Sequence, residues 1–232
     1  VIVITTKKEK PGKTSVQFSA NQVFQAVPDL QRVEQLDAAE MIGLETDLFN
    51  KGFYNALINN TATRPPLSPL IEMLLLRKNG RISAADSARY VQDWQQKDIR
   101  NDFEKYIYQP VWQQQYALAV SGGTDKYRFN FSSGYDKNRE QLKGNSYERI
   151  SSRLFNSIKL MERVTLDNTF SYTYGRQLSN SPGAYGATGY QLGSFALPHY
   201  ASLINTDGKA ASLPGNYRDI YTDTVGGGRL LD

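Results

Sequence analysis

The 232-residue chain contains no cysteine and a single histidine, His199. Without cysteine there can be no disulfide framework, no thiolate metal site and no cysteine nucleophile. One histidine cannot supply the two or three imidazoles that hold most catalytic zinc ions. We therefore expect the protein to use no metal and no other cofactor.

Long apolar runs and concentrated charge are also missing. No stretch approaches the 18 apolar residues of a transmembrane helix, and the central cluster Leu74–Leu76 is far too short. A transmembrane β-barrel gives no such continuous signal, so this lack does not exclude one. The formal net charge is only +4 and no block of Lys or Arg occurs, which argues against a nucleic-acid partner.

The carboxylate pairs of the chain do not suggest catalysis. Asp98 with Asp102 and Asp219 with Asp223 lie at helical or loop spacing without a nearby base. General acid–base chemistry needs such groups to be positioned against a partner or a substrate proton. We therefore expect that this chain is not an enzyme.

Hydrophobic periodicity divides the chain into segments. Residues 1–6 are β-branched without alternation, residues 14–25 alternate, and the pattern then becomes helical up to residue 108. Asp37 with Glu40 predicts a capping box, Ser68-Pro69 a second helix start and Ser83 a third, while Gly52 and Gly80 predict helix ends. The chain starts within a strand pattern and without Met, so we expect it to be an excerpt of a longer protein.

Alternation returns in four runs between residues 111 and 174, each with one apolar face. Those faces carry no Lys, Arg, Asp or Glu, a pattern that suits a hydrocarbon surface and a soluble core equally well. The connections between the strands distinguish a membrane barrel from a soluble core better, because the short segments 121–125 and 161–163 alternate with long ones. Short turns alternating with long loops are typical of outer-membrane barrels. Aromatic side chains, which make up 12% of the chain, also gather toward the strand ends, where interfacial belts lie.

The two faces of these strands give two sets of predicted positions. Residues expected to face lipid are Val16, Phe18, Trp112, Tyr116, Leu118, Phe129, Phe131, Leu154, Ile158, Leu166, Phe170 and Tyr172. Residues expected to face a wet lumen are Gln113, Gln115, Arg128, Asn130, Arg153, Asp167 and Thr169.

Two stretches resemble a known family. "VIVITTKK" followed by "GKTSVQFSAN" resembles the end of the plug domain and the first barrel strand of the SusC/RagA family. These are TonB-linked outer-membrane transporters of the Bacteroidetes. "QQYALAVSGGTDKYRFNFSSGYDKNREQLKGNSYERISSRLFNSIKLMERVTLDNTFSYTYGR" is similar to the strands that follow in that family. The resemblance covers residues 1–24 and 108–176 well and the helical segment only loosely.

The resemblance implies a mainly β fold, a partial antiparallel transmembrane β-barrel of about five strands plus the last plug strand, against about 22 strands in a whole transporter. It implies the end of the plug domain at 1–10, the first barrel strand at 11–27 and four barrel strands at 111–176. The segment 28–110 becomes a long helical extracellular loop insertion, and 177–232 becomes an extracellular loop region.

The resemblance also implies a function for the whole protein. A member of this family imports a glycan or another oligomeric nutrient, such as a peptide, across the cell outer membrane. Its implied partners are outer-membrane lipid, a SusD-like surface lipoprotein that acts as a lid, and the TonB energy-coupling complex. The TonB complex would act through parts of the protein that this chain lacks.

Aromatic residues among small polar ones near the C-terminal end suggest a ligand surface, because rigid rings with small polar neighbours suit stacking. Ordinary loop packing is the alternative interpretation. The candidate substrate-binding residues are Tyr185, Tyr190, His199, Tyr200 and Tyr217.

A different class of protein fits part of the same pattern. The chain could be a soluble extracellular β-rich module that binds glycans. In that case the helices of residues 28–108 would cover the apolar strand faces and complete an α+β core.

Overall fold

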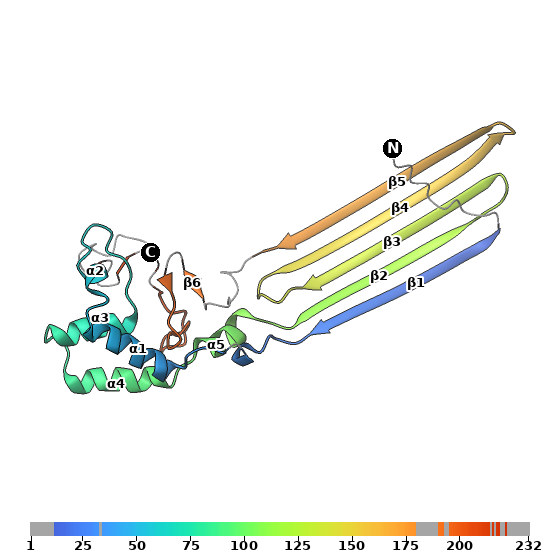
Figure 1. Cartoon of the computed structure of the whole chain (residues 1–232). Helices are drawn as coiled ribbons and strands as arrows, with labels where there is room; N and C mark the ends of the chain where they lie inside the picture. Colours follow the sequence, from blue (N-terminus) through green and yellow to red (C-terminus); the bar gives the residue numbers. More distant parts are fainter. Residues whose placement is uncertain are drawn as a thin grey trace. The chain divides into compact units, whose positions relative to one another are not determined.

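A computed structural model describes residues 12–32, 34–179, 190–192 and 195–213, with the single residues 215, 217, 218 and 221. These residues divide into two compact units (Figure 1). One unit lies within Val1–Val27 and Tyr108–Pro182, and the other within Pro28–Ile107 and Gly183–Asp232. The run predicted as the last plug strand, residues 1–10, lies outside the described part of the chain.

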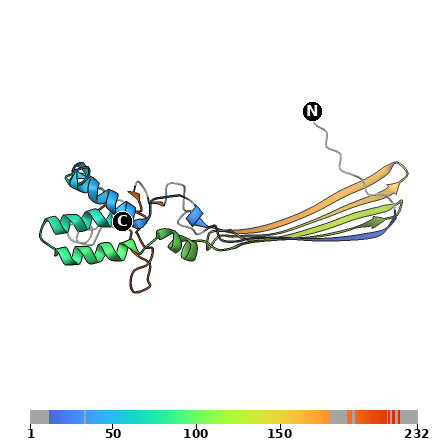
Figure 2. The same cartoon turned by 60° about the horizontal axis from the view of Figure 1, so that its bottom comes forward.

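The first unit is an antiparallel sheet of five long strands in the order β1-β2-β3-β4-β5, each paired with its neighbour in sequence. Figure 2 shows it nearly edge on, as a single layer of strands. The sheet is not closed, and with the helices of the second unit it confirms the predicted fold class, a mainly β chain with part of an antiparallel barrel and a helical insertion. The strands are β1 (Gly12–Gln25), β2 (Val111–Gly123), β3 (Tyr127–Arg139), β4 (Ser146–Met161) and β5 (Val164–Leu178).

Two tight turns join β2 to β3 and β4 to β5. Gly123 at the first has a φ of +147°, and a Cβ there would lie 2.2 Å from the carbonyl oxygen of Tyr127. Only glycine fits such a position. In the second turn the register shifts between Lys159 and Met161, so that Met161 pairs with Val164 across two intervening residues.

The second unit contains the helices α1 (Ala38–Asn50), α2 (Asn55–Ile58), α3 (Pro69–Lys78), α4 (Ala84–Gln95) and α5 (Ile99–Asp102). A 3-10 turn at Leu30–Arg32 and a π-helical turn at Phe103–Ile107 complete its helical part. Two short strands, β6 (Gln191–Leu192) and β7 (Phe195–Ala196), pair in the C-terminal segment. Among the described residues, no helix has the length and apolar character needed to cross a bilayer.

The predicted helix starts are confirmed. Asp37 caps α1 in a full capping box, in which its carboxylate accepts from Glu40 N at 2.7 Å while Glu40 accepts from Asp37 N at 3.0 Å. Ser68 caps α3 ahead of Pro69, and Ser83 caps α4. Gly52 and Gly80 have positive φ angles just past α1 and α3, as expected for helix ends.

The core of the helical unit joins distant parts of the sequence. A buried cluster combines Ala38 and Ile42 of α1, Leu70 and Met73 of α3, and Tyr200 of the C-terminal segment. The helices thus bury their apolar stripes against one another, as amphipathic helices do.

Replacing Leu70, which is fully buried, tests this core. We expect Leu70→Ala to lower the free energy of unfolding of the helical unit by about 2–5 kcal/mol, because it removes apolar contacts and leaves a cavity. Leu44→Ala, at a 46% exposed position of α1, is the control and should cost far less. Urea unfolding followed by Trp94 fluorescence in a Trp112→Phe background measures both. Equal losses would contradict the assigned core.

Candidate functional site

One face of the five-stranded sheet is apolar across its whole width. Strand register aligns Val16, Val120, Phe131, Leu154 and Phe170 in one row from β1 to β5. By the same register, every residue of the predicted lipid-facing set lies on this face: Val16, Phe18, Trp112, Tyr116, Leu118, Phe129, Phe131, Leu154, Ile158, Leu166, Phe170 and Tyr172.

The apolar face is exposed. Phe18 is 69% exposed, Phe170 is 65% exposed and Leu166 is 48% exposed. Scattered apolar residues on a surface are ordinary, but a contiguous patch of this extent marks a protein or membrane interaction surface.

A polar row crosses the apolar face toward the end of the sheet away from the tight turns, and Phe24, Trp112 and Leu178 lie beyond it on the same face. Register aligns Gln22, Gln114, Lys137, Glu148 and Arg176 in the polar row. Lys137, Glu148 and Arg176 lie outside the alternating runs predicted from the sequence, because the strands are longer than those runs. Within the runs, this face carries no charged residue.

A row with three tyrosines lies just inside the polar row. Tyr116, Tyr135 and Tyr174 share it with Ala20 and Ile150. Tyr135 Oη donates a hydrogen bond to a carboxylate oxygen in the polar row, Glu148 Oε1. The band from the β2–β3 turn to this row therefore covers residues 127–135 of β3, close to the roughly 9–11 residues of a membrane-crossing strand.

The opposite face is polar. It carries all the predicted lumen-facing residues: Gln113, Gln115, Arg128, Asn130, Arg153, Asp167 and Thr169. Arg149 and Asp136 form an ion pair at 2.7 Å on the same face. Positively and negatively charged side chains therefore occur along the whole length of this face.

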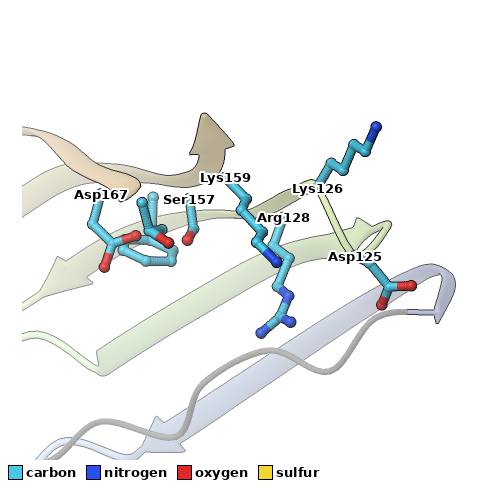
Figure 3. Close-up of a pocket in the computed structure, with 8 residues that line it drawn as sticks. Asp125, Lys126, Arg128, Ser157, Lys159 and Asp167 are labelled. Atoms are coloured by element: carbon cyan, nitrogen blue, oxygen red, sulfur yellow. The ribbon is translucent and has the colours of Figure 1, made fainter. Parts of the chain in front are cut away.

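A hollow of about 230 Å³ lies on this polar face beside the tight turns. Figure 3 shows Arg128, Ser157 and Asp167, which are register partners on β3, β4 and β5, together with charged residues around them. Such a site can hydrogen-bond and pair with a polar molecule. The lining residues are Asp125, Lys126, Arg128, Phe155, Ser157, Lys159, Thr165 and Asp167.

Throughout the described ranges, no group of three or more His, Asp or Glu side chains could hold a metal ion. Two of the carboxylates considered in the sequence analysis, Asp98 and Asp102, have structural partners. Asp98 binds Arg100 at 2.8 Å, and Asp102 accepts from Ser202 Oγ and Leu203 N at 2.8 Å.

Two of the five candidate substrate-binding residues, Tyr190 and Tyr200, are buried. Tyr190 is buried, with its ring centroid 4.9 Å from that of Phe103. Tyr200 is 1% exposed and stacks on Trp94 at 5.5 Å. Rings buried to this extent pack the protein and offer no face to a ligand.

The remaining candidates have other surroundings. His199 Nδ1 bonds to Leu36 O, and the backbone oxygen of His199 accepts from Ile99 N at 2.9 Å. The ring of Tyr217 lies 6.1 Å from that of Tyr221. Tyr185 lies outside the described residues.

A buried carboxylate in the helical unit was not predicted. Glu45 of α1 is only 6% exposed, and its Oε2 accepts hydrogen bonds from Ser68 Oγ at 3.0 Å and from Tyr200 Oη. The sequence contains a signal for this burial, because Glu45 lies seven positions after Ala38 and three after Ile42, and residues at these spacings share one helix face. An acid on the apolar face of a helix needs partners that only the tertiary structure can supply.

Burial raises the pKa of Glu45, and the hydrogen bonds from Tyr200 and Ser68 offset that effect only in part. Burial and the nearby Glu45 carboxylate also raise the pKa of Tyr200. The fold therefore holds a proton on Glu45 more tightly than the unfolded chain does.

This linkage predicts a pH dependence of stability. Because the folded pKa of Glu45 lies above its unfolded value, its contribution to stability is complete below the unfolded pKa and is lost as pH rises through the folded pKa. Glu45→Gln keeps an acceptor and cannot ionise, so its free energy of unfolding should rise relative to wild type between pH 4 and 8. Urea unfolding across that range measures the difference. Asp47→Asn, at an exposed position of the same helix, should follow wild type, and parallel Glu45→Gln and wild-type curves would contradict the assignment.

Comparison with known proteins gives matches only among solved structures. No protein-family model matches the chain, and no curated protein matches it. A structure of the RagAB peptide importer in a closed-closed state is similar with a TM-score of 0.54 and 15% identity, covering 91% of this chain and 23% of that chain. An open-open state of the RagAB peptide importer gives 0.53 and 15%, covering 94% and 25%.

A structure of the RagAB peptide transporter gives a TM-score of 0.52 and 16% identity, covering 86% of this chain and 22% of that chain. The chain thus spans about a quarter of the length of the structures that it matches. At this identity the likeness concerns the fold, which is shared with part of a peptide importer.

Proposed function

We propose that this chain is a segment of a SusC/RagA-type, TonB-linked importer in the cell outer membrane. The whole protein would carry a glycan or another oligomeric nutrient, such as a peptide, without chemical conversion. The observation that carries the proposal is the exposed apolar band across all five strands, with Phe18 and Phe170 about two-thirds exposed. The fold shared with part of a peptide importer supports it.

Acyl chains are the proposed neighbours of the apolar band. Its central row contains only aliphatic and aromatic side chains, and a Lys or Arg at the bilayer midplane would cost about 2–4 kcal/mol. Tyr116, Tyr135 and Tyr174 lie where the band meets the polar row, the position that interfacial aromatic residues occupy.

The polar face would line the interior of the barrel. Arg128, Arg153 and Asp167 would contact water, the plug or the cargo in that lumen. Charges of both signs on one wall suit a hydrated path, because water and opposite charges compensate their desolvation.

The helical unit would lie outside the cell. The tight turns at residues 124–126 and 162–163 lie at one end of the sheet, and the segments at its other end include the whole helical insertion. Bacterial barrels place short turns in the periplasm and long loops outside. A SusD-like lipoprotein would then meet the helical unit, and the TonB complex would act through parts of the protein beyond this chain.

Membrane extraction tests the proposal against a soluble glycan-binding module. We expect the intact protein to stay with the membrane fraction in high salt and in alkaline carbonate and to leave it only in detergent. The core of the helical unit draws on α1, α3 and Tyr200, so its helices already have an apolar partner in each other. Release by carbonate alone would refute the importer and favour the soluble module.

Paired arginine substitutions test which face meets lipid. Phe170→Arg puts a charge in the central apolar row, so it should lower the free energy of unfolding of the vesicle-inserted protein by about 2–4 kcal/mol. Thr169→Arg places the same side chain on the polar face and is the matched control, with a much smaller expected loss. Urea titration of the vesicle-inserted protein measures both, and equal losses would contradict the assignment of faces.

A further inference from the structure

The helical unit contains a second hollow that the proposed transport function does not use. Its volume is about 350 Å³, and it lies beside the start of α3. Its lining is mostly apolar and contains a single carboxylate, that of Glu45. The lining residues are Glu45, Tyr54, Leu57, Pro65, Pro66, Leu67, Ser68 and Ala196.

Glu45 has no positive partner among the residues that the structure describes. Both of its hydrogen bonds come from hydroxyl groups, and both end on Oε2. Its other oxygen, Oε1, accepts no hydrogen bond within the described ranges, and no described Lys, Arg or His forms an ion pair with Glu45. Carboxylates buried to this extent are normally paired with a cation.

The walls of the hollow are fixed without a ligand. Pro65 and Pro66 have restricted φ angles, and the residue before them, Arg64, accepts a hydrogen bond from Arg218 N at 3.1 Å. Arg218 is itself held by two 2.8 Å contacts to Glu72 on α3. A preformed hollow binds with little ordering cost.

We propose that this hollow binds a primary organic ammonium carried on a small apolar body. The ammonium group donates to Glu45 Oε1 and supplies the missing positive charge. The apolar body packs against Leu57 and the two prolines, and the ring of Tyr54 offers a further surface to the cation. The site would operate whether or not the protein transports nutrients.

Charge rather than shape selects an ammonium at this hollow. An ammonium stabilises the ionised form of Glu45, whereas a neutral hydroxyl that donates to Oε1 brings no positive charge to it. A charged hydrogen bond is worth about 1.5–3 kcal/mol in proteins, which corresponds to about 10-fold to 100-fold in affinity. The charged and neutral forms of one skeleton should therefore differ at least about tenfold.

Calorimetric titration of the intact protein at neutral pH tests this site with two probes of equal size. Phenethylammonium is the cation and 2-phenylethanol is its neutral counterpart. We expect the ammonium to bind at least about tenfold more tightly than the alcohol. Equal affinities, or no binding of phenethylammonium, would overturn the proposal.

Variants assign the binding to the hollow. Glu45→Gln should weaken phenethylammonium binding at least about tenfold and leave 2-phenylethanol unchanged. Asp47→Asn removes an exposed carboxylate from the same helix and should bind like wild type. Unchanged ammonium binding by Glu45→Gln would overturn the proposal.

A second variant guards against a folding defect in Glu45→Gln. Leu57 is 40% exposed and lines the hollow, so Leu57→Trp should fill it without disturbing the core and abolish binding of both probes. Near-ultraviolet circular dichroism establishes that each variant is folded. Wild-type ammonium affinity in a folded Leu57→Trp protein would place the binding elsewhere and overturn the proposal.

Discussion

The sheet depends on a cover for its apolar face. Neighbouring strands pair through backbone hydrogen bonds, but a single layer leaves most side chains of its apolar face uncovered. Phe18, Leu166 and Phe170 are 69%, 48% and 65% exposed, and each square ångström of apolar surface left in water costs about 25 cal/mol. The proposed bilayer would remove that penalty without any further protein element.

The helical unit covers its apolar side chains with its own residues. Leu70 and Ile71 are fully buried, and Tyr200, far along the chain, completes the cluster that α1 and α3 begin. This closure brings Glu45 inside, where Ser68 and Tyr200 supply hydroxyl donors. The unit thus combines an ordinary apolar core with a buried carboxylate that accepts hydroxyl hydrogen bonds but forms no ion pair with the described residues.

Sequence reasoning predicted the features that depend on neighbours in the chain. The capping box of Asp37 and Glu40 is local, as are the caps formed by Ser68 and Ser83, and all three occur where expected. Alternation of apolar and polar residues predicted which face of its strand each residue occupies. Paired residues of neighbouring strands share a face, and the observed register puts the residues predicted for one face on the same side of the sheet.

Contacts between distant segments could not be predicted in this way. Glu45 and Tyr200 are 155 positions apart, so no local pattern shows that one will donate to the other. Tyr190 and Tyr200 looked like loop aromatics because their polar neighbours hide their packing on Phe103 and Trp94. The short strands β6 and β7 likewise have too few residues to show a period.

The polar row shows why the strands extend past the apolar band. Lys137, Glu148 and Arg176 are register neighbours on β3, β4 and β5, so positive, negative and positive side chains stand directly opposite one another. Opposite charges in that arrangement favour strand pairing, and Tyr135 ties the acid to the aromatic row. Strand pairing continues past this row, where Phe24, Trp112 and Leu178 again lie on the same face. Under the proposed membrane location, the apolar band on the turn side of this row is the part of the sheet that would meet lipid.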